Sequence, residues 1–160
     1  MEMRILNRTI KFRGKMIPEN EWIFGTILRI PAPPVCFGKS ETDKYYIQFP
    51  DPRYMPDWNM PYKMVQGEVN PETIGQYTGL HDKNGKEIYE GDIIEWTTLS
   101  GKKYRFSVEY SNKYAQYIIT NTGDVENEAE PLGDYENIEV IGNVFENGDI
   151  LNDSKNTEKN

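Results

Sequence analysis

Hydrophobic residues along this chain of 160 residues fall in short alternating runs, and almost every run is bounded by Gly, Pro, Asn or Asp. Alternation with a period of two is typical of β-strands, whose successive side chains point to opposite faces. Gly, Pro, Asn and Asp are the residues that most often form the turns between strands. The pattern therefore predicts a mainly β protein with little helix.

The first 70 residues are expected to form an N-terminal β region that begins with a hairpin. Leu6, Ile10 and Phe12 share one parity along the chain. A second apolar run, Trp22–Leu28, follows after a turn at Pro18–Glu21. We interpret the two runs as the two strands of this hairpin.

A segment rich in proline and aromatic residues lies in this region, between about residues 31 and 64. Within it only Tyr45–Phe49 has the pattern of a strand. Proline cannot donate to a strand ladder, so it is confined to the edges and ends of sheets. We expect the rest of this segment to be an ordered loop or an insertion.

Tight-turn signals are concentrated in the second region, residues 71–147. Asn84 and Gly85 can take positive φ at both central positions of a type I′ turn, whose twist suits a two-residue hairpin. Gly91 and Asp92 then give a second bend before an apolar run. We predict that Asn84, Gly85, Gly91 and Asp92 are structural turn residues.

Further apolar runs with strand periodicity follow the second bend. Three of these runs are Ile93–Thr98, Tyr114–Thr120 and Ile138–Phe145. In a fourth run, Tyr104, Phe106, Val108 and Tyr110 share one parity and are expected to face a core. Five short strands with tight turns in so short a region suit a small closed or partly open barrel. The tail, residues 148–160, has no apolar residue after Leu151 and is expected to be disordered.

Charge and cysteine content narrow the partners and the compartment. The formal net charge is −8 with a pI near 4.8, a field that repels phosphate backbones, so we do not expect duplex nucleic acid as a partner. Cys36 is the only cysteine, which rules out an intramolecular disulfide and indicates a reducing compartment. No signal-peptide pattern occurs, and no stretch approaches the roughly 20 apolar residues of a membrane helix. We expect a cytoplasmic protein with no membrane partner.

Few residues are candidates for metal binding or catalysis. Glu90 and Asp92 are weak candidates for a Mg²⁺ or Ca²⁺ site, because two carboxylates spaced by two residues can point the same way on an extended chain. The alternative, which we favour, is a bend whose Asp92 carboxylate accepts backbone N–H bonds. His81 is the only histidine, which excludes multi-histidine zinc sites. No phosphate-binding loop, nucleophile elbow or dinucleotide fingerprint occurs, so we predict no catalytic residue, no cofactor and no enzymatic activity.

Two features of the sequence allow a binding hypothesis as well as a purely structural explanation. Aromatic residues that could form a stacking platform for single-stranded nucleic acid are Tyr77, Tyr89, Trp96, Tyr104 and Tyr110. The acidic stretch Glu126–Glu136 is either a solvated loop or a mimic of DNA charge that occupies a host protein's basic groove. Core packing is the simpler explanation of the aromatic residues. A solvated loop is the simpler explanation of the acidic stretch.

Several motifs resemble the YopX family of phage and prophage proteins. They are Ile10–Lys15, Trp22–Gly25, Gly75–Leu80, Asp82–Ile94 and Val140–Asn147. The resemblance leaves out the tail and the segment from about residue 31 to 61. It implies an SH3-like small β-barrel over residues 71–147, packed with the N-terminal hairpin region, and a phage-encoded origin. It supplies no established biochemical activity and no catalytic residue.

The leading hypothesis is a non-enzymatic phage accessory or scaffold protein that binds an unknown phage or host protein. The alternatives are a nucleic-acid-associated module or acidic DNA mimic and, third, a metal-assisted hydrolase. A homo-oligomer is also expected, because large aromatic patches are uncommon on monomers and small domains gain stability by assembling. The candidate interface residues are Tyr45, Tyr54, Trp58 and Tyr62.

Overall fold

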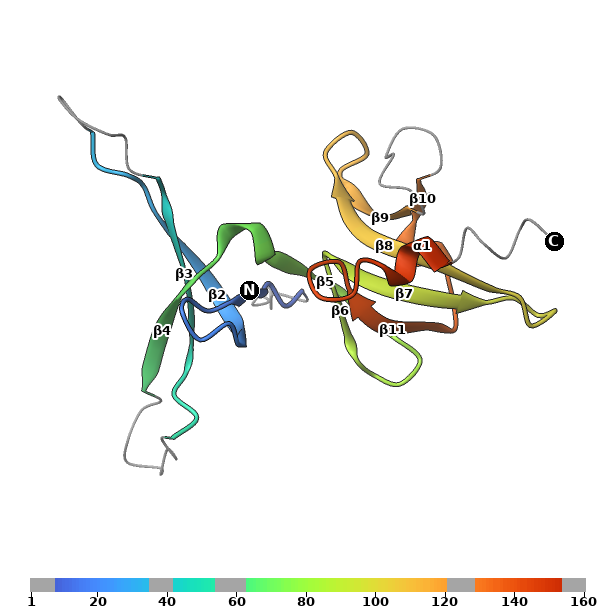
Figure 1. Ribbon diagram of the computed structural model, residues 1–160, viewed down its shortest axis with the longest axis horizontal. Coiled ribbons are helices and arrows are strands. Elements are labelled where there is room, and N and C mark those ends of the chain that lie inside the picture. The colour runs from blue at the N-terminus through green and yellow to red at the C-terminus, as the bar shows by residue number, and fades with distance from the viewer. Residues whose placement is uncertain (1–7, 35–41, 54–62, 121–128, 154–160) are drawn as a thin grey trace, which may run out of the picture. The chain divides into compact units, whose positions relative to one another are not determined.

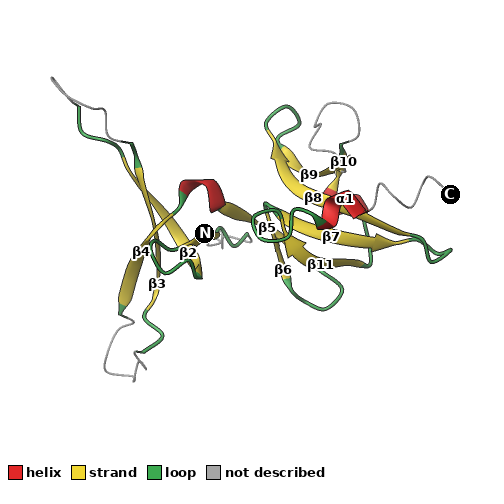
Figure 2. Cartoon of the chain, viewed as in Figure 1, coloured by secondary structure: helices red, strands yellow, loops and turns green. Residues whose placement is uncertain are grey.

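The computed structural model describes residues 8–34, 42–53, 63–120 and 129–153 (Figure 1). The strands in these ranges form two antiparallel sheets, and the helical segments are only one turn long (Figure 2). These segments are η1 (Pro71–Thr73), η2 (Leu132–Asp134) and α1 (Ile150–Asp153). The prediction of a mainly β protein with little helix is confirmed. Neither sheet closes on itself, so strand pairing in the described residues does not form a closed barrel.

The chain divides into two compact units, residues 10–76 and residues 77–160 with 1–9. The division falls inside strand β5 (Gly75–His81), a few residues beyond the boundary expected from the sequence. The first residues of β5 pair with the N-terminal hairpin, at Arg13↔Gly75 and Phe12↔Gln76. The start of β5 therefore completes the N-terminal sheet, and its remainder belongs to the second unit.

Within its described residues, the N-terminal unit has four strands of its own. They are β1 (Phe12–Lys15), β2 (Trp22–Ile30), β3 (Lys44–Pro50) and β4 (Met64–Val69), and the sheet order is β4-β3-β2-β1-β5-β6. The expected hairpin is present as β1 and β2, and the expected strand at residues 45–49 is β3, longer by one residue at each end. Strand β4 was not predicted, because its apolar signal consists of little more than Val65 and Val69 on one parity.

The core of the N-terminal unit is small. Ile23, Ile47 and Val69 are buried on one face of the sheet, and burying each such side chain contributes about 1.5–3 kcal/mol. Gly25 is required where β2 crosses β3, because a Cβ atom there would lie 2.0 Å from the carbonyl oxygen of Gln48. Glycine at this position therefore permits the close approach of the two backbones.

The second unit is built on a five-stranded sheet of order β10-β9-β8-β7-β11. Its strands are β7 (Asp92–Thr97), β8 (Lys103–Ser111), β9 (Gln116–Thr120), β10 (Glu130–Pro131) and β11 (Ile138–Asn143), and the short strand β6 (Glu87–Tyr89) pairs with β5. One face of the sheet forms the core, in which Ile94, Val108 and Ile119 are fully buried. The two-residue periodicity of β7, β8 and β9 aligns these side chains across the ladder.

Two expectations for the second unit are corrected. Tyr110 does not face the core: it is 43% exposed, because β8 extends past the buried cluster, and its ring contacts Tyr117 edge-on. The expectation of disorder is wrong for residues 148–153, because Ile150–Asp153 forms helix α1 and the Ile150 carbonyl accepts a hydrogen bond from Arg105 Nη1 (3.3 Å). Residues 154–160 lie outside the described residues.

Candidate functional site

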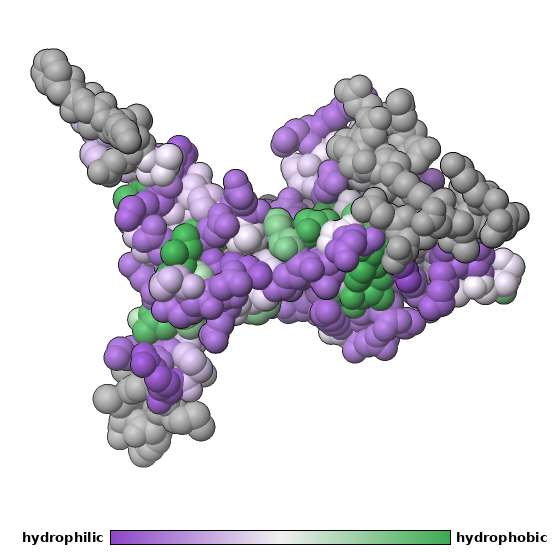
Figure 3. All heavy atoms as spheres, viewed as in Figure 1, coloured by the Kyte–Doolittle hydropathy of each residue, from purple (hydrophilic) through white to green (hydrophobic). Residues whose placement is uncertain are grey.

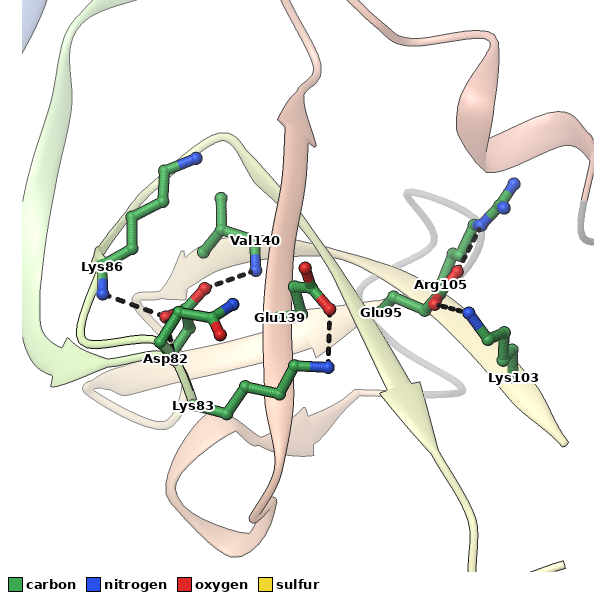
Figure 4. Close-up of polar contacts among 9 residues, drawn as sticks. Asp82, Lys83, Lys86, Glu95, Lys103, Arg105, Glu139 and Val140 are labelled. Carbon is green, nitrogen blue, oxygen red and sulfur yellow. Dashed lines mark hydrogen bonds and ion pairs between the residues drawn. The ribbon is translucent and has the colours of Figure 1, made fainter. Parts of the chain in front are cut away.

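Asp82 joins the turn between β5 and β6 to strand β11 (Figure 4). Its buried carboxylate accepts hydrogen bonds from the backbone N–H groups of Asn84 (2.8 Å), Lys86 (2.9 Å) and Val140 (3.0 Å). Burial by itself raises the pKa of Asp82, but the three N–H donors and the charge of Lys86 outweigh burial, so the pKa lies below its ordinary value. The carboxylate therefore acts as a structural anion at this junction.

Neighbouring contacts cover the outer edge of β11. The Lys83 N–H donates to the Ile138 carbonyl (2.9 Å), and the Lys83 Nζ pairs with Glu139 Oε2 (2.6 Å) (Figure 4). The N–H of Val140 is already bound by Asp82. Because edge strands pair with other chains through unpaired backbone groups, these contacts leave β11 unsuited to strand addition at this point.

The first turn of the YopX-like motif Asp82–Ile94, which we call the first signature turn, differs in type from the prediction. Gly85 has the expected positive φ (81°), but Asn84 is not among the described residues with positive φ. The Gly85 N–H donates to the Asp82 carbonyl (2.9 Å), which places Lys83 and Asn84 at the centre of the turn. The prediction of a type I′ turn is wrong because the Asp82 side chain binds the Asn84 N–H and stabilises an Asx-type turn instead.

The bend at Gly91 and Asp92, the second signature turn, is also structural. The buried Asp92 accepts a hydrogen bond from the Tyr89 N–H at Oδ2 (2.8 Å). Gly91 has φ 78°, its N–H donates to Val108, and its carbonyl accepts from Val144, both at 2.8 Å. Among the described residues there is no group of three or more His, Cys, Asp or Glu side chains that could hold a metal ion, and the metal site at Glu90 and Asp92 stays an untested alternative. The geometry at Asp92 is that of a bend.

The last YopX-like motif, Val140–Asn147, also consists of residues that fix the path of the backbone. A Cβ atom at Gly142 would lie 2.7 Å from the Oδ1 of Asn147, so a side chain there would displace the Asn147 side chain. Asn143 Oδ1 accepts from the N–H groups of Phe145 (3.1 Å) and Glu146 (3.0 Å). These residues hold the chain in a compact loop after β11.

Charged residues on β7 and β8 neutralise one another. The largely buried Glu95 accepts hydrogen bonds from Lys103 Nζ (2.6 Å) and Arg105 Nε (3.3 Å) (Figure 4). The hydrogen bond from Lys103 and then that from Arg105 lower the pKa of Glu95, against the opposing effect of burial. A carboxylate held by two cations is stabilised as an anion and is not poised to transfer protons.

The five aromatic residues considered for a stacking platform lie in separate ring contacts. The structure pairs them as Tyr77–Tyr89 (5.5 Å between ring centroids), Trp96–Tyr104 (5.8 Å), and Tyr110 with Tyr117 (5.3 Å). His81 lies edge-on to the Tyr77 ring, and its ring nitrogens are 3.3 Å from the Tyr77 hydroxyl. Burial, and then the charge of Glu87, raise the pKa of Tyr77. These contacts are those of packed side chains.

A groove of about 770 Å³ lies in the N-terminal unit. The start of β2, the end of β3 and the turn that follows β3 supply its aromatic and proline walls: Trp22, Phe24, Phe49, Pro50 and Pro52. Its size lies within the range of ligand sites in proteins, roughly 300–1,000 Å³, and such sites are mostly apolar with a few polar groups. This groove is the candidate functional site.

An ion pair is part of the groove lining. Asp51 Oδ1 accepts from the backbone N–H (3.1 Å) and Nε (3.0 Å) of Arg53, and Oδ2 accepts from Nη2 (3.2 Å). The Asp51 side chain is buried, while that of Arg53 is 83% exposed. The hydrogen bonds from Arg53 hold the pKa of Asp51 below its ordinary value. Asp51 thus positions a guanidinium group that remains exposed to solvent.

Two further cations flank Trp22. The Arg13 guanidinium carbon lies 4.8 Å and the Lys15 Nζ 5.5 Å from the centre of its ring. Strand register places Lys15 opposite Trp22 and Arg13 opposite Phe24, so all four side chains lie on one face of the β1–β2 pair. Arg13 is buried and Lys15 is half-buried. Cation–π contacts stabilise by about 0.5–1 kcal/mol at exposed sites and by more where the cation is desolvated.

Apolar side chains extend along the same face of β2. Phe24 is 47% exposed, and Leu28 and Ile30 share its parity and are exposed as well. The view in Figure 3 shows apolar residues as separate green patches within a mostly hydrophilic surface. Of the candidate interface residues, Tyr45 packs against the core of the N-terminal unit. Tyr54, Trp58 and Tyr62 lie outside the described residues.

Sequence reasoning did not find the groove. Its walls come from positions 22–24 and 49–53, which are far apart in the chain and meet only when β2 pairs with β3. One local signal was available, since Trp22 and Phe24 place two large aromatic side chains on one parity of a strand.

The family model for the YopX protein matches residues 11–152, which is most of the chain and includes both signature turns. The chain belongs to the YopX family. A solved structure similar to this YopX chain is that of protein EF1440 from Enterococcus faecalis, with 20% identity and a TM-score of 0.46. That comparison covers 91% of this chain and 99% of the other. No curated protein matches the chain.

The YopX signature residues observed here act on backbone geometry and packing. None of the helices in the described ranges has the length and apolar character of a membrane span. Among the described residues, the groove beside Trp22 has the character of a binding site.

Proposed function

We propose that this YopX protein is a non-enzymatic, phage- or prophage-encoded accessory module that binds an extended segment of a phage or host protein. The observation that carries the proposal is the groove lined by Trp22, Phe24 and Phe49. Aromatic side chains bury large apolar areas and dominate the energetics of interfaces. An extended segment fits a groove between strand ends better than a globular surface does.

The test is selection of binding peptides from a displayed library, followed by affinity measurement with matched variants. Trp22→Ala and Phe24→Ser are expected to weaken binding of the selected peptides at least tenfold. Leu99→Ser is the control, because Leu99 is a fully exposed apolar residue of the other unit. Selected peptides that bind both groove variants as tightly as the wild type would refute the proposal.

Self-association is part of the same proposal. The exposed side chains Phe24, Leu28 and Ile30 on one face of β2, with Met64 on β4, support it. A second copy placed on this face would cover apolar area that is otherwise in contact with water. The aromatic residues at positions 54, 58 and 62 remain candidate interface residues in this proposal.

We also infer that the second unit is a partly open relative of SH3-like barrels. Support comes from the hairpin turn at Asp82 and Lys83, which hydrogen-bonds to the edge of β11 and so links the β5–β6 hairpin to the five-stranded sheet. An experimental structure of residues 77–153 within the full chain tests this inference directly.

A further inference from the structure

We infer that the segment bound at the groove is added as a further strand to the outer edge of β4, at Met64 and Gln66. This inference rests on the proposed function, since it names the conformation of the partner and the backbone groups that hold it. The partner is an extended segment of another protein, with an apolar side chain between two residues other than proline. Extended peptides bind to exposed sheet edges in this way in several kinds of protein domain.

The outer edge of β4 is only partly covered by the chain itself. β4 pairs with β3 along its whole length and is the last strand of the N-terminal sheet on that side (Figure 1). On its other side, the Ile17 N–H donates to the Glu68 carbonyl (2.8 Å), next to an antiparallel bridge between Met16 and Val69. The end of β4 thus already accepts a strand on its outer side, and a partner would continue this pairing toward the start of β4.

The backbone groups at the start of β4 point outward. Each residue of an antiparallel strand directs its N–H and C=O to the same side, and the side alternates along the strand. The Glu68 carbonyl points outward, whereas the Lys63 carbonyl points inward and accepts from the Asp51 N–H (2.9 Å). Because the register with β3 has no bulge, Met64 and Gln66 share the orientation of Glu68. Among the described residues, their N–H and C=O groups have no backbone partner on the outer side.

The other edge strands are protected against strand addition. Within the described residues, the edges of the two sheets are β4, β6, β10 and β11. β11 is covered by Asp82 and Lys83, and β10 has two residues, one of which is Pro131. In the three-residue strand β6, the Tyr89 N–H is bound by Asp92. The first three residues of β4 include neither a charge nor a proline, so this edge is the one open to a partner strand.

Val65 connects this edge to the groove. Its side chain lies on the face opposite to those of its two neighbours in β4, and it lines the groove together with its cross-strand partner Phe49. A partner residue opposite Val65 on the outer side places its own side chain on the same face, beside Val65. Met16, Phe49 and Val65 make this part of the lining apolar. The partner side chain that enters the groove here is therefore apolar.

The remaining requirement on the partner concerns its backbone. Antiparallel pairing opposite Met64 and Gln66 joins each of two partner residues to β4 by two hydrogen bonds. Proline cannot supply the N–H for either pair. The charged groups of the lining add little selectivity, because Asp51 and Arg53 bind each other and Glu21 is exposed to solvent. Backbone pairing and one apolar side chain thus define the partner.

The first test uses peptides that each carry one N-methyl group, with the full chain as the receptor. The parent peptide is the tightest binder selected from the displayed library, with acetylated and amidated ends. Methylation at the two paired positions, which are separated by one residue, removes a donor to β4 and is expected to weaken binding about tenfold or more. Methylation of the residue between them is expected to weaken binding much less. Equal effects at all positions would overturn the inference.

Amide hydrogen exchange of the full chain locates the peptide on the protein. Without peptide, the outward N–H groups of Met64 and Gln66 are expected to exchange faster than the inward groups of Val65 and Gly67. Saturating parent peptide is expected to slow exchange at Met64 and Gln66 about tenfold or more. Unchanged exchange at these two positions, with peptide binding lost in Trp22→Ala, would overturn this inference and leave the proposed function standing.

Proline substitution tests the same edge from the side of the protein. Gln66→Pro removes an outward N–H but no hydrogen bond to β3, and is expected to weaken binding of the parent peptide about tenfold or more. Gln66→Ala keeps the N–H and is expected to bind clearly more tightly than Gln66→Pro. Leu99→Pro is the control, because Leu99 is exposed and occupies the second position of a turn closed by the Gly101 N–H and the Thr98 carbonyl (2.9 Å), where proline is favoured. Should Gln66→Pro fail to fold, the methylated peptides decide the question on the wild-type protein.

Other occupants of the groove and the edge give different results. A library that yields only proline-rich peptides would overturn this inference, since such peptides bind aromatic grooves without strand pairing. Slow exchange at Met64 and Gln66 that appears without peptide and increases with protein concentration would replace the partner by a second copy of β4. A library that yields no binding peptide would refute the proposed function and this inference with it.

Discussion

Asp82 Oδ2 accepts a hydrogen bond from the Val140 N–H at 3.0 Å, although the two residues are 58 positions apart in the chain. The same carboxylate binds the N–H groups of Asn84 and Lys86 in its own turn. One side chain therefore shapes the β5–β6 turn and also satisfies a backbone donor on the edge of β11. The most distinctive motif of the chain is explained by this link between a local turn and a distant strand.

We expect Asp82→Ala to lower the free energy of unfolding by about 3 kcal/mol, because it leaves three backbone N–H groups without their acceptor in a mostly buried place. Asp82→Asn keeps one carbonyl oxygen and is expected to lose about half as much. Urea denaturation followed by circular dichroism measures both values. Glu136→Ala, at an exposed position of the same unit, is the control and is expected to change stability by less than about 0.5 kcal/mol.

The lowered pKa of Asp82 predicts a dependence of stability on pH. The folded state binds the ionised carboxylate, so the stabilisation is complete above the unfolded pKa of about 3.9 and is lost as the pH falls through the lower folded value. Stability of the wild type measured between pH 6 and 2 is expected to fall more steeply than that of Asp82→Asn. Parallel curves for the two proteins would show that another carboxylate is responsible.

Gly85 and Gly91 both have positive φ, but only Gly91 is crowded. A Cβ atom at Gly91 would lie 2.6 Å from Cε2 of Phe145, whereas nothing lies within 4 Å of one at Gly85. Gly85→Ala is expected to cost about 1–2 kcal/mol from backbone conformation alone. Gly91→Ala is expected to cost about 1–3 kcal/mol more from overpacking. Thermal unfolding of the two variants measures the difference, and equal losses would contradict the close approach of Phe145.

Self-association is expected because apolar side chains are exposed along one face of β2. Light scattering after size exclusion at micromolar concentration is expected to give a mass that is a multiple of 18.7 kDa. Phe24→Ser combined with Leu28→Ser is expected to shift the protein toward the monomer, and Leu99→Ser is not. A mass of 18.7 kDa for the wild type at every concentration would refute this prediction.

Features that depend on nearest neighbours in the chain were predictable. Alternation identified β2, β3, β7 and β9 to within a few residues, because side-chain direction in a strand follows from a two-residue period. The positive φ of Gly85 was predictable for a related reason, since glycine adopts that conformation without a Cβ clash. The cap of η1 is another local feature, because Asn70 precedes Pro71 in the chain and its Oδ1 accepts from the Glu72 N–H (3.1 Å).

Other features depend on how distant segments meet, and only the tertiary structure decided them. The groove forms because the pairing of β2 with β3 brings Trp22 near Phe49, and no local pattern states which strand ends will be neighbours. Tyr110 has the parity of a core residue and is exposed because the buried cluster ends before it. Local periodicity determines which way a side chain points, whereas burial and binding depend on what the rest of the chain places there.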